Sequence, residues 1–265
     1  MNKLAKNGPL TFIIGGIFVG ILVIAACHLL GFVFPPLAKG GSMAVLLFDW
    51  STPPLLPIPY PFTIQNLTTL VLFAALGELW WHRLATKKAQ TFVHMKLLPE
   101  DDRTVLGPVE LASIRLKVLE VSAGQDAFLP SAIDQVIMHF QVNRTTNEAH
   151  ELLNSMVDLE MHRVDLSYAT LRYVTRLLPS LGLLGTIVGI ALALEAMAKA
   201  QAPVSMNDVI KSLATSFNTT IVGLAWSMIV IFGMTKAQRE EEAAVNKGAS
   251  YCLKNLINRL FVPPT

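Results

Sequence analysis

The sequence is poor in charged residues. Only 15% of its 265 residues are Asp, Glu, Lys or Arg, whereas a soluble domain carries roughly 25%. So few charges cannot cover a water-facing globule of this size, and 52% of the residues are hydrophobic, with a mean hydropathy of +0.50. The 21 Lys and Arg nearly balance the 19 Asp and Glu, which excludes the basic stripe of a nucleic-acid-binding protein. The composition predicts a membrane protein that binds no nucleic acid.

Cysteines are scarce and enzyme motifs are missing. The two cysteines, Cys27 and Cys252, lie far apart, so they predict neither a disulfide framework nor a thiolate metal centre. The sequence holds no G-x-x-x-x-G-K-S/T phosphate loop, no H-E-x-x-H and no G-x-S-x-G. Histidines without ligand spacing are interpreted as surface residues: His82, His94, His139, His150 and His162. We therefore expect no enzyme, no cofactor and no metal site.

Long apolar stretches, by contrast, are abundant. A bilayer core of about 30 Å needs about 20 helical residues, and four stretches between charged flanks reach that length. They cover residues 9–34, 62–81, 177–198 and 213–234. The second is the most polar, because it contains Glu78 and several amides and hydroxyls. The pattern predicts an all-α membrane protein with four transmembrane helices.

The connecting segments differ in proline and in positive charge. Seven of the 15 prolines lie between the first two stretches, which predicts a helix-poor loop there. Lys and Arg gather at the N-terminus, after the second stretch and after the fourth, which favours a cytoplasmic location for these parts and for both termini. The predicted organisation is an N-terminal segment with the first transmembrane helix (1–34), a proline-rich periplasmic loop (35–61), the second helix (62–81), a cytoplasmic helical domain (82–176), the third helix (177–198), a periplasmic loop (199–212), the fourth helix (213–234) and a cytoplasmic amphipathic tail (235–265).

Two polar segments carry apolar residues at helical spacing, over residues 152–159 and 253–261. We interpret both as amphipathic helices that extend the third and fourth stretches. Packing within the bundle is favoured over docking of a partner as the use of their apolar faces.

A stripe of glycines runs along the third stretch. Gly182, Gly185 and Gly189 follow Pro179 at spacings of three and four, so they fall near one face of a helix. Small residues at this spacing let another helix approach closely, and Gly223 in the fourth stretch suits the same use. These residues are interpreted as helix-packing positions of a pore.

Hydroxyl groups accompany the glycines. Thr186 and Thr220 each lie nine to ten residues inside a basic flank, which at about 1.5 Å per residue puts both near the middle of the membrane. Ser216 and Thr219 add hydroxyls at helical spacing. Two interpretations stay open: each hydroxyl bonds to a carbonyl of its own helix, or the four line an ion path.

Charge is absent from the centres of the third and fourth stretches. Glu195, near the periplasmic end of the third, either pairs with Lys199 four residues further on or serves as an ion entrance. If protons cross here, another chain must supply the carboxylate that carries them.

These residues resemble the MotA/TolQ/ExbB family of ion-driven stator and energiser subunits. The family pattern of a proline followed by LGLLGT and a glycine is similar to Pro179, Gly182, Gly185, Thr186 and Gly189. The pattern of a threonine three residues before GL is similar to Thr220, Gly223 and Leu224.

The resemblance implies a ring-forming pentamer around two copies of a single-span partner of the MotB/TolR/ExbD kind, in the bacterial inner membrane. The partner's membrane aspartate would take the transported proton or sodium ion, and Thr186 and Thr220 would line its path. Ion flow would do mechanical work on a flagellar, Ton/Tol-like, gliding or phage-defence machine. The alternative is a non-conducting scaffolding protein whose glycine and threonine stripes only pack helices.

Overall fold

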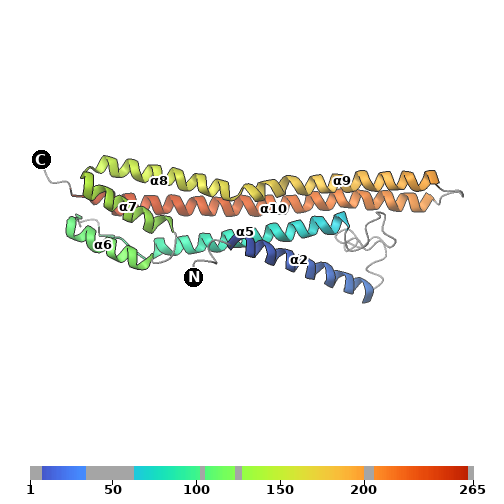
Figure 1. Ribbon diagram of the computed structural model, residues 1–265, viewed down its shortest axis with the longest axis horizontal. Helices are drawn as coiled ribbons and strands as arrows, with labels where there is room; N and C mark the ends of the chain where they lie inside the picture. The colour runs from blue at the N-terminus through green and yellow to red at the C-terminus, as the bar shows by residue number, and fades with distance from the viewer. Residues whose placement is uncertain (1–7, 34–62, 102–104, 123–126, 200–205, 262–265) are drawn as a thin grey trace. The chain divides into compact units, whose positions relative to one another are not determined.

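The computed structural model describes residues 8–33, 63–101, 105–122, 127–199 and 206–261, and these are helical almost throughout (Figure 1). The elements in chain order are α2 (Gly8–Val33), α5 (Ile64–His94), α6 (Pro108–Val121), α7 (Phe128–Asn143), α8 (Thr146–Ser167), α9 (Ala169–Lys199), α10 (Met206–Asn255) and the 3₁₀ turn η1 (Ile257–Arg259). Within the described ranges, strand-type pairing is limited to one parallel bridge between Leu106 and Leu260. The predicted all-helical fold class is confirmed.

Several helices begin or end at residues that differ from the predicted boundaries. The proline-rich loop, 35–61, lies outside the described residues. The loop predicted at 199–212 is too long, because α9 ends at Lys199 and α10 already begins at Met206, three residues after the helix-breaking Pro203. Residues 152–159 belong to α8, which leads into α9 with only Tyr168 between the two helices. At the C-terminus, α10 stops at Asn255, and the helix predicted over 253–261 gives way to η1.

Internal contacts divide the chain into two units. The apolar unit comprises Asn7–Trp81 and Thr170–Met234. The polar unit comprises His82–Ala169 and Thr235–Thr265, together with Met1–Lys6. Helices α5 and α10 are each divided between the two units.

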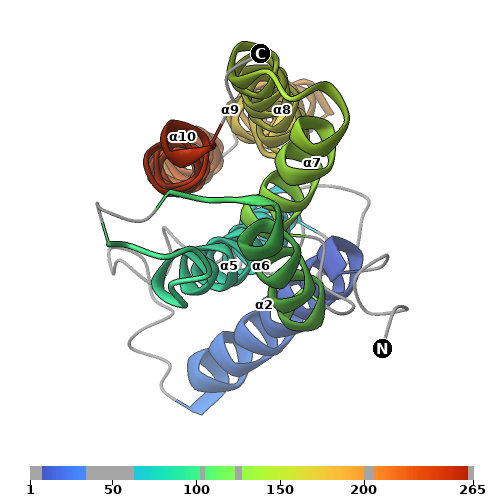
Figure 2. The same cartoon turned by 90° about the vertical axis from the view of Figure 1, so that its left-hand side faces the viewer.

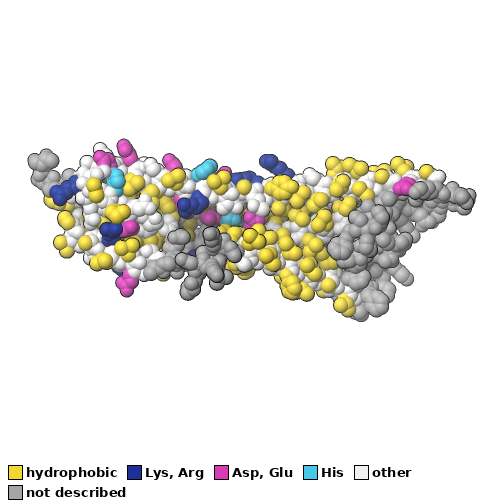
Figure 3. Space-filling model, in the orientation of Figure 1, with side chains coloured by type: hydrophobic (Ala, Val, Ile, Leu, Met, Phe, Trp, Pro, Cys, Tyr) yellow, Lys and Arg dark blue, Asp and Glu magenta, His cyan; other side chains and the backbone are white. Residues whose placement is uncertain are grey.

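Large apolar side chains lie on the surface of the apolar unit. Phe18, Ile187 and Phe232 are examples, each more than half exposed. In Figure 3, hydrophobic side chains cover much of the described surface of this unit, with few charges among them. Such a surface suits hydrocarbon rather than water.

Three stretches of helix are long and apolar enough to cross a membrane: Pro9–Cys27, Thr146–Glu195 and Ser216–Arg259. They overlap the first, third and fourth predicted transmembrane helices. The second, 62–81, is not among them, although α5 runs through it. Length and hydropathy by themselves therefore support three spans in the described part of the chain.

The polar residues of α5 explain why this helix scores low. Those in the part of α5 that belongs to the apolar unit are buried: Gln65, Asn66, Thr68, Thr69 and Glu78. The hydroxyls of Thr68 and Thr69 donate to the carbonyl oxygen of Gln65 at 2.7 and 3.1 Å, and the indole of Trp226 in α10 donates to Thr69 Oγ1 at 3.4 Å. A hydropathy average counts these groups as if they faced lipid, whereas the fold turns them inward.

The core of the polar unit is built from α6, α7, α8 and the adjoining ends of α5 and α10. Figures 1 and 2 show α7 lying against both α6 and α8. The buried side chains include Val118, Ile133, Ile137, Leu153, Cys252, Leu256 and Ile257. The apolar residues near the C-terminus therefore pack within the helical bundle, as predicted.

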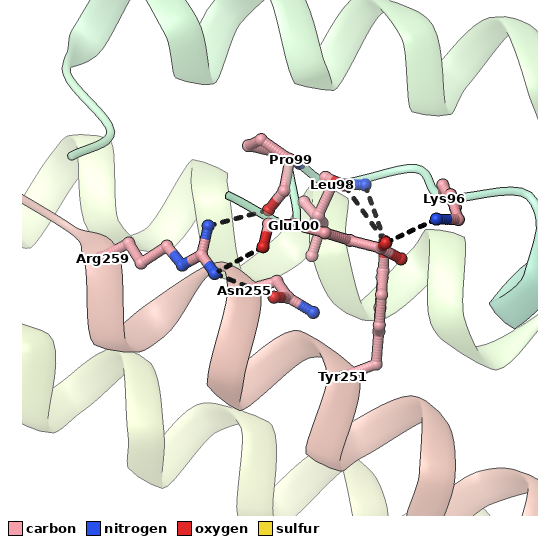
Figure 4. Close-up of polar contacts among 7 residues, drawn as sticks. All are labelled: Lys96, Leu98, Pro99, Glu100, Tyr251, Asn255 and Arg259. Carbon is pink, nitrogen blue, oxygen red and sulfur yellow. Dashed lines mark hydrogen bonds and ion pairs between the residues drawn. The ribbon is translucent and has the colours of Figure 1, made fainter. Parts of the chain in front are cut away.

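Polar contacts fasten the end of α10 to the segment after α5 (Figure 4). The guanidinium of Arg259 donates to the carbonyl oxygens of residues 99–101 and, at 3.2 Å, to Oδ1 of Asn255. The hydroxyl of Tyr251 donates to the carbonyl oxygen of Leu98 and accepts its N–H, both at 3.2 Å. Because Arg259 is buried, these oxygen acceptors replace the water molecules that would otherwise solvate its charge.

Candidate functional site

Helices α9 and α10 run side by side in the apolar unit, and glycines set their separation (Figure 1). A Cβ atom on Gly182 would lie 2.9 Å from the carbonyl oxygen of Thr219 and 3.0 Å from the Cα of Thr220. A Cβ atom on Gly223 would lie 2.6 Å from the carbonyl oxygen of Leu178. These neighbours are backbone atoms that cannot turn aside, so the two helices approach this closely only because both positions are glycine.

Two of the predicted hydroxyl residues fill the space that other glycines leave open. A Cβ atom on Gly185 would lie 2.5 Å from Oγ1 of Thr219, and one on Gly189 would overlap the side chain of Ser216. Thr219 and Ser216 are both buried, and Thr219 Oγ1 donates to the carbonyl oxygen of Ser216 at 2.7 Å. In this structure the two side chains lie in the packed seam between α9 and α10.

Thr186 and Thr220 lie opposite each other across the same seam, and their Oγ1 atoms are in direct contact. The hydroxyl of Thr186 also lies 3.2 Å from the carbonyl oxygen of Gly182 in its own helix and 3.1 Å from that of Ser216 in α10. The hydroxyl of Thr220 lies 3.0 Å from the carbonyl oxygen of Gly182. Both side chains are half-buried, unlike Ser216 and Thr219.

These atoms form an oxygen cluster, made of Oγ1 of Thr186, Oγ1 of Thr220 and the carbonyl oxygens of Gly182 and Ser216. The Gly182 carbonyl has two lone pairs, one of them used by the α-helical hydrogen bond, yet three threonine hydroxyls lie within 3.2 Å of it. The hydroxyl protons must therefore be shared among several acceptors. Such a cluster keeps lone pairs available for a cation or a water molecule.

A family model for the MotA/TolQ/ExbB proton channel family matches residues 120–248. The match runs from the last residues of α6 through α9 and most of α10, and it includes both Thr186 and Thr220. Residues 120–248 belong to the MotA/TolQ/ExbB proton channel family. No curated protein and no solved structure matches the chain.

Membership in the MotA/TolQ/ExbB family confirms the resemblance drawn from the glycine and threonine motifs. The family is one of proton-channel-type energiser and stator subunits, a class of channels. The family match leaves out α2 and α5.

Ionisable groups are absent from the sequence of the α9 and α10 segments that hold the oxygen cluster. Neither residues 177–194 nor residues 213–234 include Asp, Glu, Lys, Arg or His. Glu195 lies just beyond the first of these segments and is exposed. The side chain of Lys199 lies outside the described part of the chain, so the ion pair and the ion entrance both stay predictions for Glu195.

A second polar cluster, which the sequence analysis missed, lies in the polar unit. The ring of His82 stacks on that of Tyr168, with ring centroids 4.2 Å apart. Both side chains contact Oε2 of Glu241: Nδ1 of His82 lies 3.3 Å from it, and the Tyr168 hydroxyl donates to it at 2.9 Å. The interpretation of His82 as a surface residue is wrong, because it is 2% exposed. Its spacing of three residues from the apolar Leu79 was the signal available in the sequence. Burial, and then the charge of Glu241, raises the pKa of Tyr168 above its ordinary value.

Proposed function

We propose that this chain is the ion-conducting subunit of a MotA/TolQ/ExbB-type stator, and that Thr186 and Thr220 line its proton or sodium path. The observation that carries the proposal is the oxygen cluster, half-buried between two helices of an apolar unit. Close packing of α9 and α10 requires the glycines but not a pair of facing hydroxyls. Oxygen atoms with spare lone pairs at this depth are what a partly dehydrated cation needs.

The proposed path requires a partner chain. A proton carrier must gain and lose a proton, which a threonine hydroxyl does not do near neutral pH, and the adjoining segments of α9 and α10 contain no carboxylate. The membrane aspartate of a single-span MotB/TolR/ExbD-like protein supplies that group. Five copies of this chain surround two copies of the partner, and the half-buried threonine pair faces it.

The proposed topology has four transmembrane helices in the bacterial inner membrane. Helix α5 is the second of them, because its polar side chains are buried inside the bundle and its lipid-facing side is apolar. Exposed Arg83 and Lys87 follow the second predicted transmembrane helix in the sequence and exposed Arg176 precedes the third, which favours the cytoplasm for the polar unit and both termini.

The proposal divides the four hydroxyl residues into two groups. Thr186 and Thr220 contact the ion, whereas Ser216 and Thr219 lie beside the path and hold α10 against Gly185 and Gly189. Glu195 attracts cations at the periplasmic entrance.

Ion flux through the purified complex tests this function. The chain is co-expressed with its single-span partner, reconstituted in vesicles, and assayed with a pH-sensitive dye in sodium-free buffer and with a sodium indicator. We expect Thr186→Ala and Thr220→Ala each to lower flux about tenfold, the change that a lost ion contact of about 1.4 kcal/mol produces. Thr186→Ser keeps the hydroxyl and is expected to keep most of the flux.

Ser180→Ala is the matched control, since Ser180 is an exposed residue of α9 whose hydroxyl donates only to its own helix, at 2.9 Å from the Arg176 carbonyl oxygen. Native mass spectrometry reports whether each variant still assembles. Normal conduction by assembled Thr186→Ala and Thr220→Ala complexes would show that the ion-path assignment is wrong. A wild-type complex that passes neither ion would favour the scaffolding role.

A further inference from the structure

Pro179 interrupts the hydrogen bonding of α9 at one defined place. It lies in the interior of the helix, and a proline has no N–H to donate to the carbonyl four residues earlier. In α9 that carbonyl belongs to Thr175. An unpaired carbonyl inside an apolar bundle is costly, so its partner must come from elsewhere.

The missing donor comes from the neighbouring helix. The hydroxyl of Ser227 in α10 donates to the carbonyl oxygen of Thr175 at 2.8 Å, and Ser227 is 4% exposed. A serine in a helix commonly donates to a carbonyl of its own helix, which would leave Thr175 unsatisfied. Ser227 instead forms a link between α9 and α10 at the turn that Pro179 disrupts.

The link belongs to a regular antiparallel register of α9 against α10. Leu178 lies against Gly223 one turn further along α9, and Gly182 then lies against Thr219 and Thr220. From Thr175 to Thr186 is eleven residues, or about 16 Å along the helix, with Pro179 between them. A proline without its lost hydrogen bond is a common point of helix bending, so movement there would shift Thr186 relative to Thr220.

We propose that Ser227 is a positioning residue for the ion path: its hydrogen bond to Thr175 holds the proline-broken turn of α9 in register with α10, and so keeps Thr186 opposite Thr220. This inference rests on the proposed function for its effect on conduction. Its effect on helix position does not depend on conduction.

A double-mutant cycle of S227A and P179A tests the proposal. In P179A the backbone regains a donor for the Thr175 carbonyl, so the Ser227 hydroxyl is no longer needed there. We expect S227A to lower ion flux about threefold when Pro179 is present, the change that loss of an average interhelical hydrogen bond produces. In the P179A background, S227A should leave flux nearly unchanged. S180A, which removes an exposed hydroxyl of α9, is the control for serine loss in either background.

Distances between spin labels on the two helices give a second measurement of the same double-mutant cycle. Spin labels are attached at L183C and L224C, whose native side chains are about half exposed on α9 and α10, in a chain whose own cysteines are replaced. We expect S227A to broaden the distance distribution between the labels and P179A to remove that effect.

The outcomes separate the two proposals. An S227A complex with wild-type flux and a wild-type distance distribution would overturn the positioning role, as would an equal effect of S227A with and without Pro179. If the wild-type complex conducts no ion but the distances follow the expected cycle, the proposed function fails and the role of Ser227 in holding α9 stands.

Discussion

Replacing Gly223 by alanine tests whether glycine contact sets the distance between α9 and α10. The added methyl carbon would lie 2.6 Å from the carbonyl oxygen of Leu178, 3.2 Å from the Cα of Gly182 and 3.3 Å from its nitrogen. The shortest ordinary carbon–oxygen contacts are about 3.3 Å long, so the helices would have to separate by roughly 0.7 Å. All three neighbours are backbone atoms, and no side-chain rotation can relieve the contact.

The expected loss of stability follows from two opposing terms. Overpacking a tight interface costs about 1–3 kcal/mol, whereas alanine is favoured over glycine in a helix by up to about 1 kcal/mol. We therefore expect Gly223→Ala to lower the free energy of unfolding by about 1–2 kcal/mol. Separation of the helices also pulls Thr220 from Gly182, so ion flux should fall with stability.

The assay is the free energy of unfolding in mixed micelles, measured by denaturant titration with helical circular dichroism. Gly15→Ala is the matched control, because an added Cβ at Gly15 of α2 would meet no described atom within 4 Å. That variant should be as stable as wild type or gain up to about 1 kcal/mol. The packing argument is refuted if Gly223→Ala is as stable as Gly15→Ala.

Two further predictions concern the polar unit. Burial raises the pKa of Cys252 to about 12. In a Cys27→Ser chain, the remaining thiol should therefore react with a water-soluble maleimide about a hundredfold more slowly than a free cysteine, until denaturant is added. Rapid labelling of the folded protein would contradict the burial of Cys252. The pKa of Tyr168 is raised above its ordinary value of 10.0, so its stabilising contribution is complete below about pH 10 and is lost as the pH rises further. Thermal melts from pH 8 to 11 should show a steeper alkaline loss for wild type than for Tyr168→Phe, and equal slopes would mean that the hydroxyl does not carry the effect.

Interpretations based on a long, regular pattern could be made without the structure. The uncharged stretch 9–34 predicted a helix that α2 occupies, because an apolar run of that length has one stable conformation in hydrocarbon. The third and fourth stretches predicted the apolar parts of α9 and α10 for the same reason. The spacing around Gly185 and Thr186 also led to the family, since a motif depends on residue type and spacing alone.

Hydropathy failed where a side chain faced an unexpected neighbour. Helix α5 scores as too polar to cross a membrane because Gln65 and Glu78 are counted without regard to direction, yet both are buried. His82 was placed on the surface because it lacks the spacing of a metal ligand, yet it is buried. Gly16 and Gly77 drew no attention in the sequence, although an added Cβ on either would overlap a carbonyl across the α2–α5 contact.

The sequence by itself determined that this protein is helical, that it has apolar stretches long enough to span a membrane, and which family its residues 120–248 match. These properties follow from local composition, residue spacing and the need to satisfy backbone groups within each helix. The tertiary structure decided that Thr186 meets Thr220, that Ser216 and Thr219 pack beside glycines, and that Ser227 supplies the donor that Pro179 lacks. Those pairings depend on the rotation and register of one helix against another, which many side-chain contacts set jointly and no single stretch of sequence encodes.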